Sequence, residues 1–144
     1  MRLLIFISAS LLSPAEGLVS KSTAADPIPI AHRGLLRNAP ENTLPAFAAC
    51  LELRMGFELD IRTTKDGHLV VLHDDNVQRT TNGPARSVRD MTLAELKQLD
   101  AGSWFDDAFA GERVPTLEET LSLVATRKHG QTIIALNVKH LTRE

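Results

Sequence analysis

Cysteine and tyrosine are almost missing from this chain, and aromatic residues of every kind are scarce. The 144 residues include one cysteine, Cys50, no tyrosine and only 4% aromatic residues. A single cysteine excludes an internal disulfide and a cysteine-rich metal site. Its position in an apolar helical stretch favours a small buried side chain over a reactive thiol. The fold must therefore rest on a packed apolar core, which a 43% hydrophobic composition can supply.

An excess of basic charge is also missing. Sixteen lysines and arginines stand against eighteen aspartates and glutamates, which gives a net charge of −2. No basic run is long enough to form a nucleic-acid-binding surface, so we expect no nucleic-acid partner.

The one extended hydrophobic run of the sequence is at the N-terminus, and it is too short to span a membrane. Arg2 precedes an apolar run from Leu3 to Leu12, and small or polar residues follow it. This order is typical of a secretory signal peptide, and the run is about half of what a membrane-spanning helix needs. We therefore predict a signal peptide over residues 1–25, export to the periplasm or out of the cell, and no stable membrane span.

Strands and helices alternate along the rest of the chain. The patterns predict strands at 28–32, 56–62, 69–73 and 132–139, helices at 43–54 and 117–128, and a short helix with a capping box at 92–95. This alternation favours an α/β architecture with mostly parallel strands. Asp66-Gly67 predicts a hairpin, because about seven residues cannot hold the helix that links parallel neighbours. The last strand is apolar on both sides at first, so we expect both its faces to be covered.

Polar side chains mark the ends of the first three predicted strands. His32 ends the first, Glu58 and Asp60 face the same way on the second, and His73 and Asp74 end the third. In a barrel of alternating strands and helices such groups meet at one mouth. Two carboxylates there suit Mg²⁺ or Ca²⁺, although alternate acids are also common on solvated strands. The histidines could be zinc ligands, hydrogen-bonding core residues or an acid/base pair.

The order of short motifs is more specific than any one of them. The chain reads His32-Arg33-Gly34, Pro40-Glu41-Asn42-Thr43, Glu58-x-Asp60, Thr64-Lys65-Asp66-Gly67 and His73-Asp74, and continues with Arg79-Thr80-Thr81-Asn82-Gly83, Gly102-Ser103-Trp104 and Val114-Pro115-Thr116-Leu117-Glu118-Glu119. In this order the chain resembles the glycerophosphodiester phosphodiesterase family over nearly everything after residue 28. The resemblance implies a TIM-barrel-type (β/α)8 domain, of which residues 26–144 are about the first half, with residues 75–115 as an inserted cap.

The resemblance also implies an activity and roles for named residues. The expected reaction is hydrolysis of a small-molecule glycerophosphodiester to glycerol 3-phosphate and an alcohol, with Ca²⁺ or Mg²⁺ as cofactor. The implied acid/base catalysts are His32 and His73, the implied metal carboxylates are Glu58 and Asp60, and the implied phosphate contacts are Arg33 and Lys139.

Two features depart from the family pattern. The last strand of the family usually ends Glu-x-Lys, whereas this chain has Asn137-Val138-Lys139. We expect Asn137 to act as a neutral metal ligand and to leave the ion more weakly bound. The second departure is length, since a full barrel needs roughly 250 residues. Two alternatives therefore stay open: a catalytically silent, truncated family member, or a related barrel enzyme acting on inositol or sphingolipid phosphodiesters.

Overall fold

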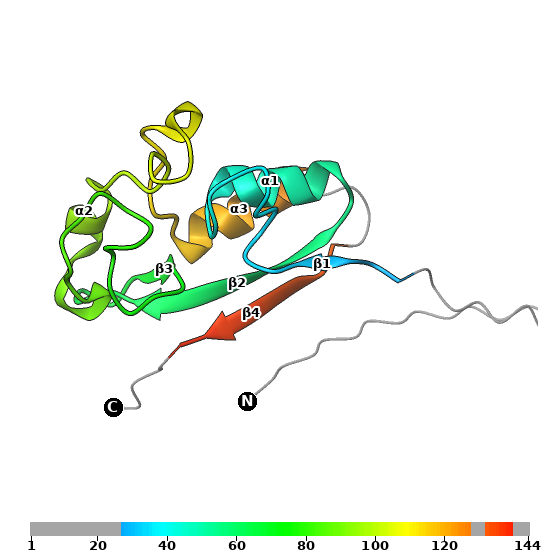
Figure 1. Ribbon diagram of the computed structural model, residues 1–144. Helices are drawn as coiled ribbons and strands as arrows, with labels where there is room; N and C mark the ends of the chain where they lie inside the picture. The colour runs from blue at the N-terminus through cyan, green and yellow to red at the C-terminus, as the bar shows by residue number, and fades with distance from the viewer. Residues whose placement is uncertain (1–26, 128–131, 140–144) are drawn as a thin grey trace, which may run out of the picture.

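The computed structural model describes residues 27–127 and 132–139. A four-stranded sheet forms its base, with β1 (Ile30–Ala31), β2 (Gly56–Thr63), β3 (Leu69–Val71) and β4 (Ile134–Val138) (Figure 1). β1 and β4 run parallel to β2 on its opposite edges, and β3 runs antiparallel to it beyond β1. The predicted signal peptide lies outside the described residues.

Two helices cover one face of this sheet. α1 (Leu44–Glu52) and α3 (Leu117–Arg127) lie side by side over β2 (Figure 1). Phe57, Leu59 and Ile61 point from β2 into the core beneath them. The ring of Phe57 stacks on that of Phe47 from α1, with centroids 4.5 Å apart. The alternation predicted for this strand is confirmed, and it turns Glu58 and Asp60 to the opposite face.

The hairpin predicted at Asp66-Gly67 is also present, since β3 folds back on the end of β2. Beyond it, residues 75–115 leave the sheet and form a lobe with 3-10 helices η1 (Val88–Asp90) and η2 (Asp107–Phe109) and the short α2 (Leu93–Leu96). The apolar core of the lobe, which includes Val77, Val88 and Leu96, is shared with Val70 and Leu72 of the hairpin. The capping box predicted for α2 is confirmed.

The last strand differs from its prediction. We expected residues 132–139 to be covered on both faces, but Leu136 and Val138 are 51% and 44% exposed. They lie beside Leu59 and Ile61 on the helix side of the sheet, and among the described residues β4 pairs only with β2. An apolar run predicts burial only where a neighbouring element exists to supply it.

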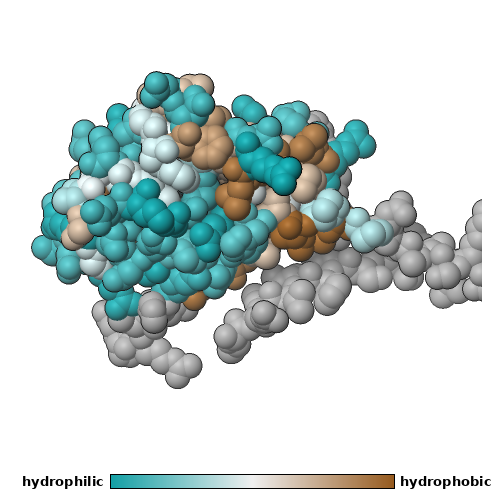
Figure 2. Space-filling model, in the orientation of Figure 1, coloured by the Kyte–Doolittle hydropathy of each residue, from teal (hydrophilic) through white to brown (hydrophobic). Residues whose placement is uncertain are grey.

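The exposed surface is otherwise mostly polar. Figure 2 shows one face of the molecule as largely hydrophilic, with apolar residues gathered mainly on the side where α1 and β1 lie. Exposed large apolar residues of the described part include Ile30, Leu36 and Leu53. No helix of the described part is long and apolar enough to cross a membrane.

Candidate active site

The loop after β1 carries the first predicted histidine. Arg33 and Gly34 both have left-handed backbones, with φ of 56° and 87°. A Cβ on Gly34 would lie 2.7 Å from that of Ala46, so the loop can lie against α1 only with glycine there. The backbone N–H of Arg33 donates to Glu58 Oε2 at 3.1 Å, and His32 Nε2 lies 3.9 Å from the same oxygen. This turn therefore holds His32 beside Glu58, with its side chain 63% exposed.

Asp60 is the buried centre of the site. Its carboxylate is fully buried, yet four side chains reach it. On Oδ2, Asn42 Nδ2 donates at 3.1 Å and Arg33 Nε lies at 3.4 Å. On Oδ1, Asn137 Nδ2 donates at 3.1 Å and Lys139 Nζ lies at 3.2 Å. The positive charges of Arg33 and Lys139 thus neutralise the buried carboxylate. Through these contacts the Asp60 side chain joins the loop after β1 to the end of β4.

The hairpin brings the second histidine to the same region. The N–H of Leu72 donates to the carbonyl of Asp60 at 3.0 Å, which places His73 next along the chain. The Arg62 guanidinium donates twice to the carbonyl of His73, at 3.0 and 2.6 Å. On the ring, Nδ1 lies 2.7 Å from Asp74 Oδ1. Both the backbone and the imidazole of His73 are therefore held in place.

An ionic bridge links the two histidine loops. Arg79 donates to both carboxylate oxygens of Glu41, at 2.9 and 2.7 Å, and to both of Asp74, at 2.6 and 2.9 Å. Glu41 also accepts from Arg33 Nη1 at 3.1 Å. Burial raises the pKa of Glu41, but its hydrogen bonds to Arg79 and the nearby charges outweigh this, so the pKa lies below its ordinary value. Hydrogen bonds from Arg79 also hold the pKa of Asp74 well below its ordinary value, so both carboxylates of the bridge are ionised at neutral pH.

Six of the seven predicted site residues come together through direct contacts, while His73 is linked to them through the backbone of Leu72 and through the Arg79 bridge. His32 lies beside Glu58, while Arg33, Asn137 and Lys139 surround Asp60, as the contacts above show. Within residues 27–127 and 132–139, no group of three or more histidines, cysteines or acids is arranged to hold a metal ion. The metal, phosphate-binding and catalytic roles stay predictions.

The chain can now be compared with known proteins. The model of the glycerophosphoryl diester phosphodiesterase family matches residues 32–142. The chain belongs to this family. A glycerophosphodiester phosphodiesterase of Caldanaerobacter subterraneus subsp. tengcongensis is 56% identical over 99 residues, which are 68% of this chain and 40% of that protein. A probable glycerophosphodiester phosphodiesterase 1 of Mycobacterium tuberculosis is 40% identical over 126 residues, which are 83% of this chain and 45% of that protein.

Solved structures of glycerophosphodiester phosphodiesterases and related phosphodiesterases share the fold. The Agrobacterium tumefaciens glycerophosphodiester phosphodiesterase is 42% identical, with a TM-score of 0.68 over 76% of this chain and 46% of its own. An Oleispira antarctica phosphodiesterase, solved in complex with the product sn-glycerol-3-phosphate, is 38% identical, with a TM-score of 0.70 over 78% of this chain and 45% of its own. The chain therefore has the α/β fold of part of a TIM barrel, and it spans less than half the length of these relatives.

Asn42 is a site residue whose role the sequence left open. The following helix could begin after Asn42 or Thr43, and the N-cap of α1 is Thr43, whose hydroxyl donates to the carbonyl of Pro40. Asn42 instead donates to Asp60 Oδ2 and accepts from the backbone N–H of Asp60 at 3.3 Å. Its left-handed backbone, with φ of 56°, turns it toward β2. Asparagine tolerates that conformation better than most residues, which is the one signal that the sequence offered.

The ionic bridge was missed for a different reason. In the sequence, Arg79 and Glu41 stand out only as members of two separate motifs. The two lie 38 positions apart in the sequence. No local periodicity pairs side chains at that separation.

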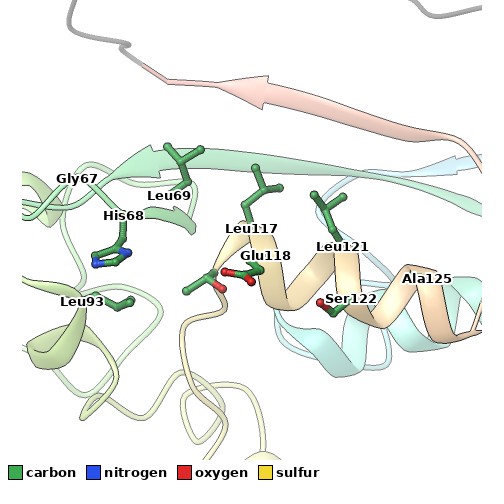
Figure 3. A pocket seen from close by; sticks show the side chains of 10 residues that line it. Gly67, His68, Leu69, Leu93, Leu117, Glu118, Leu121, Ser122 and Ala125 are labelled. Carbon is green, nitrogen blue, oxygen red and sulfur yellow. The ribbon is translucent and has the colours of Figure 1, made fainter.

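A cavity of about 690 Å³ lies elsewhere in the molecule (Figure 3). It opens between the hairpin turn, α2 and α3, and its lining includes Leu69, Leu117 and Leu121. None of the predicted site residues lines it. Leu121, which lines it, is 44% exposed.

Proposed function

We propose that this chain carries the reacting groups of a phosphodiesterase that hydrolyses small glycerophosphodiesters to glycerol 3-phosphate and an alcohol. The observation that carries the proposal is the Arg79 bridge between the His32 and His73 loops, with His32 beside Glu58 and the residue before His73 bonded to the backbone of Asp60. The product bound to the Oleispira antarctica relative supports the same substrate class.

The two histidines are proposed to move the protons. One removes a proton from the attacking oxygen, and the other protonates the departing alkoxide. Histidine suits both tasks because its ordinary pKa lies near neutrality. His32 stands open to solvent, and His73 is held through Nδ1, which leaves its Nε2 for the substrate. Arg33 and Lys139 add positive charge beside them, where a phosphate would be attracted.

A divalent cation, Ca²⁺ or Mg²⁺, belongs to the proposal. Glu58 and Asp60 offer hard carboxylate oxygens on one face of β2, and Asn137 lies opposite Asp60 in the sheet. Oxygen ligands of this kind are those that Ca²⁺ and Mg²⁺ prefer. Lys139 and the Asn137 amide, however, already contact Asp60 and would compete with the ion for its carboxylate. When bound, the ion would neutralise charge on the phosphoryl oxygens. We expect it to bind weakly.

Asn137→Glu should tighten this ion. A third carboxylate adds a negative ligand, so we expect the Kd for Ca²⁺ or Mg²⁺ to fall by roughly tenfold. Isothermal titration calorimetry on the two proteins measures this without relying on activity. Gln98→Glu adds the same charge at an exposed position of the lobe and should leave the affinity unchanged. An unchanged Kd in Asn137→Glu would show that residue 137 does not ligate the ion.

The activity itself can be assayed directly. The full chain, incubated with glycerophosphocholine, should release sn-glycerol 3-phosphate; a chelator should stop this release, and added Ca²⁺ or Mg²⁺ should restore it. His68→Ala is the control, because His68 lies at the hairpin turn near Asp66 and should not affect the rate. Folded protein that releases no product would favour the catalytically silent alternative. Faster turnover of inositol or sphingolipid phosphodiesters would favour the related-enzyme alternative.

We also propose that the chain is exported to the periplasm or the outside of the cell. The support is the order of Arg2, the apolar run and the small residues that follow it. N-terminal sequencing of the expressed protein should find a new N-terminus between Ala15 and Asp26. An intact Met1 on the cytoplasmic protein would refute export.

A further inference from the structure

We propose that Arg79 is a positioning residue that couples the two histidine loops and fixes the orientation of the His73 imidazole. The inference rests on the proposed phosphodiesterase function, and it concerns a residue that follows the hairpin and belongs to neither histidine loop. Arg79 lies between Glu41 and Asp74, and through them it acts on Arg33 and on His73.

On one side, Arg79 determines how Asp74 meets His73. Its Nε and Nη2 donate to the two oxygens of Asp74 at 2.6 and 2.9 Å. These hydrogen bonds, partly opposed by burial, hold the pKa of Asp74 far below its ordinary value. An ionised carboxylate can only accept, so the proton in the 2.7 Å contact with His73 belongs to Nδ1. Nε2 is then the nitrogen left to exchange a proton with substrate.

On the other side, Arg79 steadies the loop that carries His32. Its Nη1 and Nη2 donate to Glu41 at 2.9 and 2.7 Å, and Glu41 accepts from Arg33 at 3.1 Å. The backbone of Arg33 is in turn fixed on Glu58. One guanidinium thus connects both loops whose relative placement sets the distance between the two proton-transfer groups.

The geometry requires arginine and assigns it a positioning role. Four of the five N–H donors of Arg79 are used on two carboxylates, so little donor capacity is left for a phosphate. A lysine ammonium could not hold two carboxylates in a planar fork. The side chain is 45% exposed, and ion pairs at such positions contribute little to stability. The bridge that Arg79 forms therefore fixes the relative position of the two histidine loops and adds little to the free energy of folding.

Three variants of the full chain test the role. In Arg79→Ala and Arg79→Lys we expect kcat on glycerophosphocholine to fall about 10- to 100-fold, as for other residues that orient a reacting group, with KM nearly unchanged. Millimolar guanidinium chloride should restore part of the kcat of Arg79→Ala and leave the wild type unaffected. Arg86→Ala is the matched control, since Arg86 pairs with Glu95 in the lobe, and it should change neither parameter.

A spectroscopic measurement separates this inference from the phosphodiesterase proposal. In the wild type, the ¹⁵N signals of His73 should show a protonated Nδ1 and an unprotonated Nε2 at a pH where the ring is neutral. In Arg79→Ala, Asp74 loses the two hydrogen bonds that hold it against Nδ1, so the two tautomers should mix. If the wild type releases no product, the functional proposal fails, and the tautomer still decides the role of Arg79. An unchanged tautomer overturns the inference, and so does a rise in KM alone, which would mark Arg79 as a substrate contact. If Arg79→Ala does not fold, Arg79→Lys gives the same test.

Discussion

Replacing His73 with glutamine is expected to lower kcat for glycerophosphocholine hydrolysis by about 10²- to 10⁴-fold, the usual contribution of a positioned acid or base. Glutamine has similar hydrogen-bonding groups but cannot carry a proton between water and substrate. His32→Ala should have an effect of the same order, because the reaction needs a proton donor and a proton acceptor. Stopped assays of released sn-glycerol 3-phosphate over a range of substrate concentrations give kcat and KM separately.

A variant that carries both substitutions tests whether the two histidines act together. If the two histidines act as one unit, His32→Ala combined with His73→Gln should be little slower than either single variant. His68→Gln provides the matched control, because this histidine lies at the hairpin turn with its side chain 54% exposed. A His73→Gln protein that keeps more than a tenth of the wild-type kcat would refute the acid/base role.

Asp60→Ala is expected to lower the free energy of unfolding by about 3–5 kcal/mol, the cost of removing one partner from a buried ion pair. The Asp60 carboxylate is fully buried, and Arg33 and Lys139 both point their charge at it. Without Asp60 these two cations would face each other with no anion between them, and Asn42 would lose the hydrogen bond that its Nδ2 donates to the carboxylate. Urea denaturation in the presence of a chelator measures the loss without a contribution from bound metal.

Asp107→Ala is the control for Asp60. Asp107 is an exposed aspartate of the lobe, and surface changes of this kind usually alter stability by less than about 0.5 kcal/mol. A loss below about 1 kcal/mol in Asp60→Ala would mean that water or rearranged side chains replace its contacts easily. The site could not then depend on Asp60 to hold the strand ends together.

Local pattern was enough to predict the elements of the fold. The alternation in residues 56–62 placed Phe57 in the core and Asp60 on the opposite face, as the structure shows. The capping box predicted for α2 is also present, since Thr92 and Glu95 bond each other's backbone N–H groups. These features depend on neighbours within a few positions, so the sequence displays them directly.

The contacts that shape the site could not be predicted in the same way. Glu41 and Arg79 pair across 38 positions, and Asn137 reaches Asp60 across 77. Which charges meet at such separations depends on how the loops fold over the sheet, and many pairings satisfy the same composition. The exposure of Leu136 was missed for a similar reason, since burial is a property of neighbours that one strand does not encode.

The proposed reaction requires that both histidines act on one ligand. That claim is tested by titrating sn-glycerol 3-phosphate, with Ca²⁺ or Mg²⁺ present, into the chain carrying ¹⁵N-labelled histidine. We expect the imidazole signals of His32 and His73 to move along one binding curve while those of His68 stay in place. Movement of only one of the two, or two curves with different midpoints, would contradict it.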